Sequence, residues 1–140
     1  MVKIIRVYRL INEGKLLIKR SKILAKKIAD LSLLKKAEDI IILDLRKLTT
    51  ITDFFVICSG NSDKQVKAIV DVIIEELEKF GVKPWHKEGY QYLNWVLLDY
   101  IDVVVHVFQK ETRGFYSLER LWGDAEIIFI NDEKVVLIQI

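Results

Sequence analysis

The sequence of 140 residues contains one cysteine, one proline and one methionine, and no apolar run approaches membrane-spanning length. The single Cys58 excludes a disulfide framework and a cysteine-rich zinc module. A transmembrane helix needs about 18 consecutive apolar residues, and charged residues also interrupt the apolar stretch near the N-terminus. These shortages predict a cytoplasmic protein with no membrane contact.

Hydrophobic residues make up 51% of the chain and charged residues 30%, which suits one globular domain and excludes overall disorder. The net charge of +2 is unevenly distributed. Residues 1–36 hold eleven Lys and Arg against two acidic residues, a net charge of +9, and the other residues carry −7. The basic N-terminal part favours an anionic partner such as RNA, although a solvated lysine-rich surface explains the same charges.

The apolar pattern predicts the element order α-β-β-α-β-β-α through the middle of the chain. Ser21 is expected to cap the first helix, which would bury Ile23 and Leu34 among its apolar positions. The expected strands are 39–45, 54–59, 93–100 and 103–108, and the further helices are 62–80 and 112–122. One mixed sheet with helices packed on it, an α/β or α+β fold, is the simplest arrangement.

The clearest single element is the helix that begins after Ser62. Ser62 and Gln65 form a capping-box pattern, and Gly81 is placed to end the helix with a positive φ. Proline and glycine at 84 and 89 then indicate a loop. In the helix expected at 112–122, Phe115, Leu118 and Leu121 are spaced for one face.

Both ends of the chain are predicted to form additional hairpins. Apolar segments surround Gly14 within 3–20, and the C-terminal segment AEIIFI-NDE-KVVLIQI has the same pattern. We therefore expect a basic N-terminal extension at 1–20, the main domain at 21–125 and a C-terminal strand or hairpin at 126–140.

No set of residues predicts catalysis or a bound metal. Ser59-Gly60-Asn61-Ser62 leads from a strand into a helix N-terminus, where phosphate can bind, but it lacks the spacing of known phosphate loops. Asp99 and Asp102 flank a tight turn, which fits a Mg²⁺ pair less well than it fits turn formation. Cys58 and His106 lie in apolar strands and are expected in the core. We expect no catalytic residue, metal or cofactor.

The strand LNWVLLDY carries large side chains on both faces. Alternation places Trp95, Leu97 and Asp99 on one face, and Leu98 and Tyr100 on the other. Trp and Tyr are favoured anchors in protein interfaces. This strand is therefore either buried on both sides or part of a docking surface, and composition alone does not distinguish these.

Three sequence blocks together resemble the ribosomal silencing factor family, the Iojap-like proteins. They are DIIILDLRKLTTITDFFVICSGNSDKQVKAI, EGYQYLNWVLLDYIDVVVHVF and RGFYSLERLWGDA, and the similarity runs from about residue 23 to residue 125. One departure concerns Ile101, where that family commonly has glycine in a Tyr-Gly-Asp turn. A left-handed conformation at this position would strain a β-branched residue.

The resemblance implies a core related in fold to nucleotidyltransferases but without enzymatic activity, and a homodimer in the free state. It implies binding to the large ribosomal subunit at ribosomal protein L-fourteen, which would block joining of the small subunit and repress translation. The basic N-terminus would assist by contacting ribosomal RNA. The partner-binding residues expected from this comparison are Trp95, Leu97, Leu98, Asp99, Tyr100 and Asp102.

Two alternatives remain at this point. One is a nucleotidyltransferase-like enzyme that binds phosphates at Ser59–Ser62 and Mg²⁺ at Asp99 and Asp102. The other is an RNA-binding accessory module that uses the basic N-terminal part, although the chain lacks the aromatic motif of common RNA-recognition domains.

Overall fold

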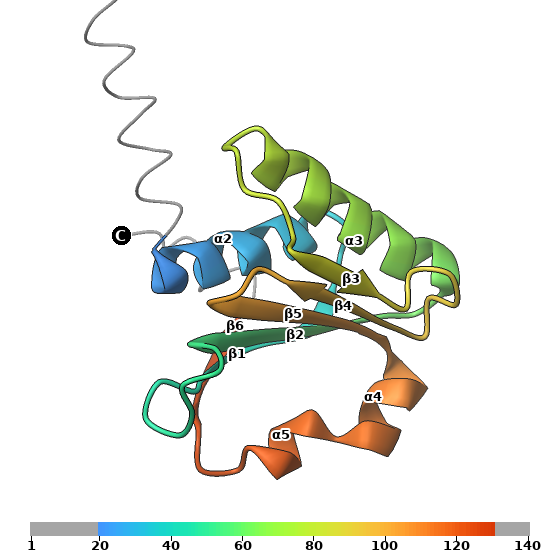
Figure 1. Cartoon of the computed structure of the whole chain (residues 1–140). Coiled ribbons are helices and arrows are strands. Elements are labelled where there is room, and N and C mark those ends of the chain that lie inside the picture. Colours follow the sequence, from blue (N-terminus) through green and yellow to red (C-terminus); the bar gives the residue numbers. More distant parts are fainter. Residues whose placement is uncertain (1–19, 131–140) are drawn as a thin grey trace, which may run out of the picture.

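A computed structural model describes residues 20–130 of the protein, which form one six-stranded mixed sheet with helices on both faces (Figure 1). The elements are α2 (Ser21–Leu33), β1 (Glu38–Asp44), β2 (Phe54–Gly60), α3 (Asp63–Glu78), β3 (His86–Glu88), β4 (Trp95–Asp99), β5 (Val103–Gln109), α4 (Lys110–Tyr116), α5 (Leu118–Leu121) and β6 (Glu126–Ile130). The strand order is β3-β4-β5-β2-β1-β6. The predicted fold class, a mixed sheet with helices packed on it, is confirmed.

The parallel pair β2 and β5 lies at the centre of the sheet, and all the other neighbouring strands are antiparallel. Both central strands are buried almost throughout, because layers cover both of their faces. Cys58 in β2 is fully buried, and this burial raises the pKa of its thiol to about 12. The cysteine is therefore a core residue, as its sequence context predicts.

The larger core lies between the sheet and the helices α2 and α3, which Figure 1 shows on the same face. The Oγ of Ser62 accepts a hydrogen bond from the backbone N–H of Gln65 at 3.2 Å. The Oε1 of Gln65 in turn accepts from the N–H of Asn61 at 2.6 Å, one residue before the expected partner. Gly81 follows the helix with φ +75°, as predicted.

The prediction for the first helix is wrong in two details. Arg20, whose side chain makes no capping hydrogen bond, is the N-cap, and Ser21 is already helical. Ile23 is 38% exposed and Leu34 is 65% exposed, although both were expected on the buried face. Leu34 lies just past the end of α2, so its side chain no longer follows the stripe that faces the sheet.

The helix expected at 112–122 is two short helices. Ser117 has φ +47° and separates α4 from α5. The break rotates the second helix relative to the first, so the expected apolar face does not form. Leu118 is buried, whereas Phe115 is 82% exposed and Leu121 is 73% exposed. The second layer therefore covers its face of the sheet incompletely and leaves large apolar side chains at the surface.

The loop expected around Pro84 contains the short edge strand β3, which pairs with β4. Its sequence HKE is polar and exposed, as is usual for edge strands that do not pair further. Gly89 ends this strand with φ +80°, and a Cβ there would overlap the backbone carbonyl of Trp95. This glycine lets the chain pass close to the backbone of β4.

β6 pairs with β1 from Ile40↔Ile130 to Asp44↔Glu126, so the first arm of the expected C-terminal hairpin belongs to the main sheet. Its second arm and the hairpin expected at 3–20 lie outside the described residues. The domain boundaries at 20/21 and 125/126 stay predictions.

Candidate protein-docking surface

β4 has one buried face and one partly exposed face, in the alternation that its sequence predicts. Trp95, Leu97 and Asp99 are partly exposed on the face opposite α2 and α3, whereas Val96 and Leu98 are fully buried. The strand lies between β3 and β5, so its backbone is paired on both sides and only its open face can contact a partner.

Two of the predicted contact residues lie in the core, which argues against them as direct contacts. Leu98 is 0% exposed and Tyr100 is 7% exposed, and both pack in the cluster beneath α2 and α3. Burial raises the pKa of the Tyr100 phenol, whose hydroxyl has no hydrogen-bond partner among the described residues. The physical reason is the strand alternation itself, which turns both side chains away from the open face.

Trp95 is held in place by an aromatic cluster. Its indole Nε1–H donates to Nδ1 of His106 at 3.1 Å. Its ring centroid lies 4.8 Å from the ring of Phe108 and 4.8 Å from that of Tyr116. The indole is therefore half core and half surface, and its truncation would affect folding as well as binding.

His106 is a buried neutral histidine. It is 3% exposed, and burial lowers its pKa to about 3. An indole N–H can only donate, so Nδ1 of His106 must be the acceptor and the proton must lie on Nε2. Within the described part of the chain, Nε2 has no hydrogen-bond partner. The expectation of a core histidine is confirmed, with Trp95 as its partner.

The turn after β4 is held by Asp99. Its Oδ1 accepts from the backbone N–H of Ile101 at 2.7 Å, which is the turn-forming role that the sequence predicts for this carboxylate. The N–H of Asp102 donates to the carbonyl of Tyr100 at 2.9 Å, so a γ-turn is centred on Ile101. The side chain of Asp102 is exposed beside it.

Ile101 adopts φ +74°, so the turn keeps the positive-φ geometry that a glycine would tolerate. A β-branched residue in this conformation is strained, at a cost of about 1–2 kcal/mol. The side chain is 58% exposed, so no burial of Ile101 offsets that cost within the described structure.

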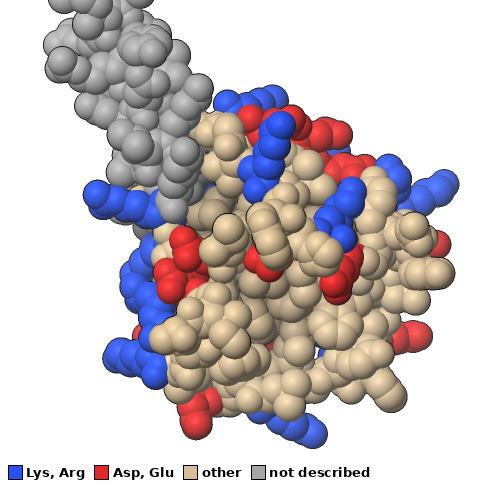
Figure 2. Space-filling view, viewed as in Figure 1, with Lys and Arg blue, Asp and Glu red and all other residues tan. Residues whose placement is uncertain are grey.

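Large apolar side chains surround the open face of β4. We call the following set the docking face: Ile51, Trp85, Tyr92, Trp95, Leu97, Asp99, Ile101 and Phe115. All its members except Leu97 line one of two hollows, one of about 490 Å³ beside Trp95 and one of about 290 Å³ beside Asp99. Figure 2 shows Lys, Arg, Asp and Glu side chains mostly in the upper part and around the edges of the view, and an area with few of them across its centre. A set of large exposed apolar side chains such as the docking face is typical of a protein interface.

Sequence reasoning missed Ile51, Trp85, Tyr92 and Phe115 as members of this surface. They are 85%, 75%, 77% and 82% exposed, respectively. Trp85 and Tyr92 lie in loops, outside any regular apolar period, whereas Phe115 lies in α4 on the predicted apolar face that the break at Ser117 disrupts. Large aromatic residues without a predicted core partner were the available signal.

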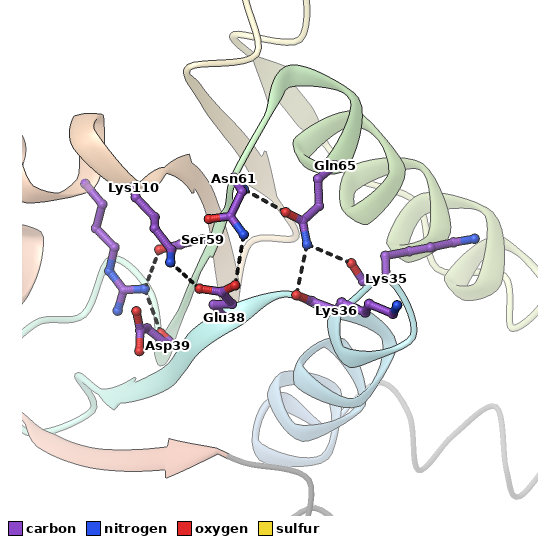
Figure 3. A network of polar contacts seen from close by, with 9 residues as sticks. Lys35, Lys36, Glu38, Asp39, Ser59, Asn61, Gln65 and Lys110 are labelled. Atoms are coloured by element: carbon purple, nitrogen blue, oxygen red, sulfur yellow. Dashed lines mark hydrogen bonds and ion pairs between the residues drawn. The ribbon is translucent and has the colours of Figure 1, made fainter.

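At the opposite end of the sheet, a network of polar contacts joins four chain segments (Figure 3). Glu38 pairs with Lys110 and accepts from Nδ2 of Asn61 at 2.9 Å. The Nε2 of Gln65 donates to the carbonyls of Lys35 and Lys36. These polar groups act as hydrogen-bond and ion-pair partners for one another, and the network connects the end of α2 to the start of α3.

Arg113 closes the same end of the sheet. It is 12% exposed in its side chain and pairs with Glu119 at 2.7 Å. Its Nη1 also donates to the carbonyl of Asp39 at 2.6 Å and to the Oγ of Ser59 at 2.8 Å. Ser59, in the segment considered for phosphate binding, is thus occupied by a structural contact.

The structure does not bring together the residues of the enzymatic alternative. Ser59 pairs with Phe108 near the end of β5, whereas Asp102 precedes Val103 at its start. Five residue steps along a strand separate these ends by about 17 Å. Ser59–Ser62 and the Asp99–Asp102 turn therefore cannot hold one Mg²⁺–nucleotide complex.

Residues 20–130 contain no group of three or more His, Cys, Asp or Glu residues arranged to hold a metal ion. No helix among these residues has the length and apolarity needed to cross a membrane.

The family model described as "Ribosomal silencing factor during starvation" matches residues 18–138. The chain belongs to the ribosomal silencing factor family. It is 48% identical over 93 residues to ribosomal silencing factor RsfS of Bacillus subtilis, covering 66% of this chain and 79% of that one. It is 40% identical over 93 residues to the chloroplastic protein Iojap of Zea mays, covering 64% of this chain and 39% of that one.

A solved structure agrees with this assignment. A crystal structure of a Bacillus halodurans protein superposes with a TM-score of 0.65 at 39% identity, covering 74% of this chain and 95% of that one. The resemblance to ribosomal silencing factors and Iojap proteins drawn from the three sequence blocks is confirmed. None of these comparisons assigns the partner-binding residues of this family member, which stay predictions.

Buried His106 predicts a specific loss of stability in acid. The unfolded chain binds a proton near pH 6.5, whereas the folded chain resists protonation down to about pH 3. Stability is therefore fully present above pH 6.5 and falls by about 1.4 kcal/mol per pH unit below it. In His106→Asn, whose amide oxygen can still accept from Trp95, this contribution to the slope should disappear.

Urea unfolding at several pH values between 4 and 7 measures the slope. The control is Leu121→Asn, because Leu121 is 73% exposed and carries no titratable group. It should keep the wild-type slope. Equal slopes for wild type and His106→Asn would contradict a buried neutral histidine.

Proposed function

We propose that this ribosomal silencing factor represses translation without enzymatic activity, by binding the large ribosomal subunit and blocking its joining with the small subunit. The observation that carries the proposal is the open face of β4 within a chain of this family. Two large surfaces cannot meet when a folded domain occupies one of them. Such a mechanism needs tight docking and no reactive group.

The proposed partner within the large subunit is ribosomal protein L-fourteen, which the family resemblance suggests. Leu97 is the central apolar contact, because it lies half-buried in the middle of β4 between the two hollows. Trp95 supplies aromatic area at one end of the strand, and Asp99 supplies a carboxylate at the other. Asp102 is a secondary contact beside the turn. Interfaces of this type draw most of their energy from a few central anchors.

The arrangement of charges supports docking over catalysis. Ser59 and Asn61 at the C-terminal end of β2 and Lys110 just after β5 lie where α/β enzymes commonly bind ligands, and they are engaged in structural contacts with Arg113 and Glu38. The large unpaired surface lies on the other side, around β4. The surface around β4 therefore offers a partner contact area and shape, and not a reactive group.

Leu97→Lys tests the docking face. A charge at the centre of an apolar interface should weaken binding to purified bacterial large ribosomal subunits by at least about 100-fold, or roughly 2.7 kcal/mol. The half-exposed position lets the lysine reach water, so the melting temperature should change little. Co-sedimentation measures binding, and sucrose gradients with both subunits measure joining.

The matched control is Leu34→Lys, an exposed leucine on the other side of the molecule at the end of α2. It should bind and block joining like wild type. A folded Leu97→Lys protein that binds fully would remove β4 from the interface. Unimpaired subunit joining in the presence of bound wild-type protein would contradict the steric mechanism.

We also propose that the basic N-terminal residues contact ribosomal RNA. Neutralised phosphates release counterions, so the logarithm of the affinity should fall linearly with the logarithm of salt concentration. Deletion of residues 1–20 removes six of the Lys and Arg residues and should flatten this dependence. An unchanged slope for the truncated, folded protein would assign those charges to solvated surface.

The free protein is proposed to be a homodimer that covers the docking face. Large apolar patches left in water favour self-association, and a two-fold symmetric pair would bury this surface on both copies. Multi-angle light scattering should give twice the 16.4 kDa chain mass at micromolar concentration. Leu97→Lys should shift the species toward the monomer. A wild-type mass that stays at one chain would contradict the dimer.

A further inference from the structure

At the Asp99 end of the docking face lies a hollow that we call the cup. Its wall residues, Ile51, Trp85 and Ile101, are 85%, 75% and 58% exposed. Asp99 and Val104 complete its lining, and its volume is about 290 Å³. Three large apolar side chains from three separate loops thus meet around one carboxylate.

The chain holds this arrangement by specific contacts. The N–H of Trp85 donates to the carbonyl of Asp99 at 2.8 Å, which fixes the loop before β3 against the end of β4. The Oδ1 of Asp99 accepts from the N–H of Ile101 at 2.7 Å and keeps that residue in its positive-φ conformation. A strained residue that presents an apolar side chain to solvent points to a binding role, because packing within the fold does not explain it.

The chemistry of the lining selects one type of side chain. The five lining residues include one carboxylate and no basic residue. The indole of Trp85 offers a face for a cation, and the two isoleucines offer apolar surface for a methylene stem. Asp99 offers an acceptor for a charge-assisted hydrogen bond. An arginine or lysine side chain satisfies all three, whereas an apolar side chain would bury the carboxylate without a partner.

We propose that the cup receives a single arginine or lysine side chain from the protein partner. This inference rests on the proposed function, because it places the cup within the surface that docks on the large subunit. It adds Ile51, Trp85 and Ile101 as specificity-determining contacts. The basic side chain would lie with its stem along Trp85 and its charged group at Asp99.

Two substitutions separate the parts of this contact. Trp85→Ala removes the aromatic wall, and because Trp85 is 75% exposed the substitution leaves the core intact. Asp99→Asn removes the charge but keeps an amide oxygen for the N–H of Ile101, so the turn is retained. Phe129→Ala, a 61% exposed aromatic residue on β6, and Asp124→Asn, an exposed carboxylate after α5, are the matched controls.

Binding of each full-length variant to purified bacterial large ribosomal subunits is measured at two salt concentrations. Trp85→Ala and Asp99→Asn should each weaken binding at least tenfold, and the controls should stay within about twofold of wild type. The double variant should be weaker by less than the product of the two single effects, because both contact one side chain. Asp99→Asn should also reduce the salt dependence of the affinity.

Each other outcome overturns the proposal in a recognisable way. Weaker binding in Trp85→Ala with wild-type affinity in Asp99→Asn would mean that an apolar group fills the cup. Wild-type affinity in both variants would place the cup outside the interface, while a loss of binding in Leu97→Lys would still support docking through β4. Absence of binding by the wild-type protein would remove the proposed function and the cup together. If Trp85→Ala fails to fold, Ile51→Ser tests the opposite wall.

Discussion

The rest of the structure depends on the position of β4 as the second strand of the sheet, between a short polar edge strand and the buried β5. This position pairs its backbone on both sides, so the strand can meet a partner only through side chains on one face. Because side chains alternate between the two faces of a strand, every other side chain of β4 lies in the core beneath α2 and α3. Within residues 20–130, the opposite face is covered by the two short helices α4 and α5, which leave Leu97 partly exposed.

The two ends of the parallel pair β2–β5 have different roles, and the difference is physical. At the end where the strands lead into α3 and α4, charged and polar groups pair with one another through Glu38 and Arg113. Paired groups gain little from a new ligand, because binding would first break existing contacts. At the other end, the positive-φ Ile101 and the indole of Trp85 lie beside Asp99, and both side chains are exposed. A partner can bury these side chains without first breaking contacts of that kind.

The sequence predicts the regular elements well because their signals are local. Continuous apolar runs mark β2 and β5, and the Ser62 cap marks α3, since each reflects burial or a hydrogen bond within a few residues. The open face of β4 also follows from alternation. The exposed side chains of Trp85 and Phe115 could not be predicted, because their exposure depends on the edge strand β3 and on the break at Ser117. Both features arise from tertiary packing, which no short sequence window contains.

Buried His106 explains how an aromatic docking face can stay ordered without becoming sensitive to physiological pH. Its Nδ1 fixes the indole of Trp95, and burial keeps the ring neutral far below pH 7. A partly exposed histidine in the same place would titrate near neutrality and would change the hydrogen bond to Trp95 with it. This arrangement costs stability, because the buried Nε2 of His106 has no hydrogen-bond partner among the described residues. The unpaired Nε2 lowers the stability of the fold, whereas the neutral ring keeps the hydrogen bond that orients the neighbouring indole.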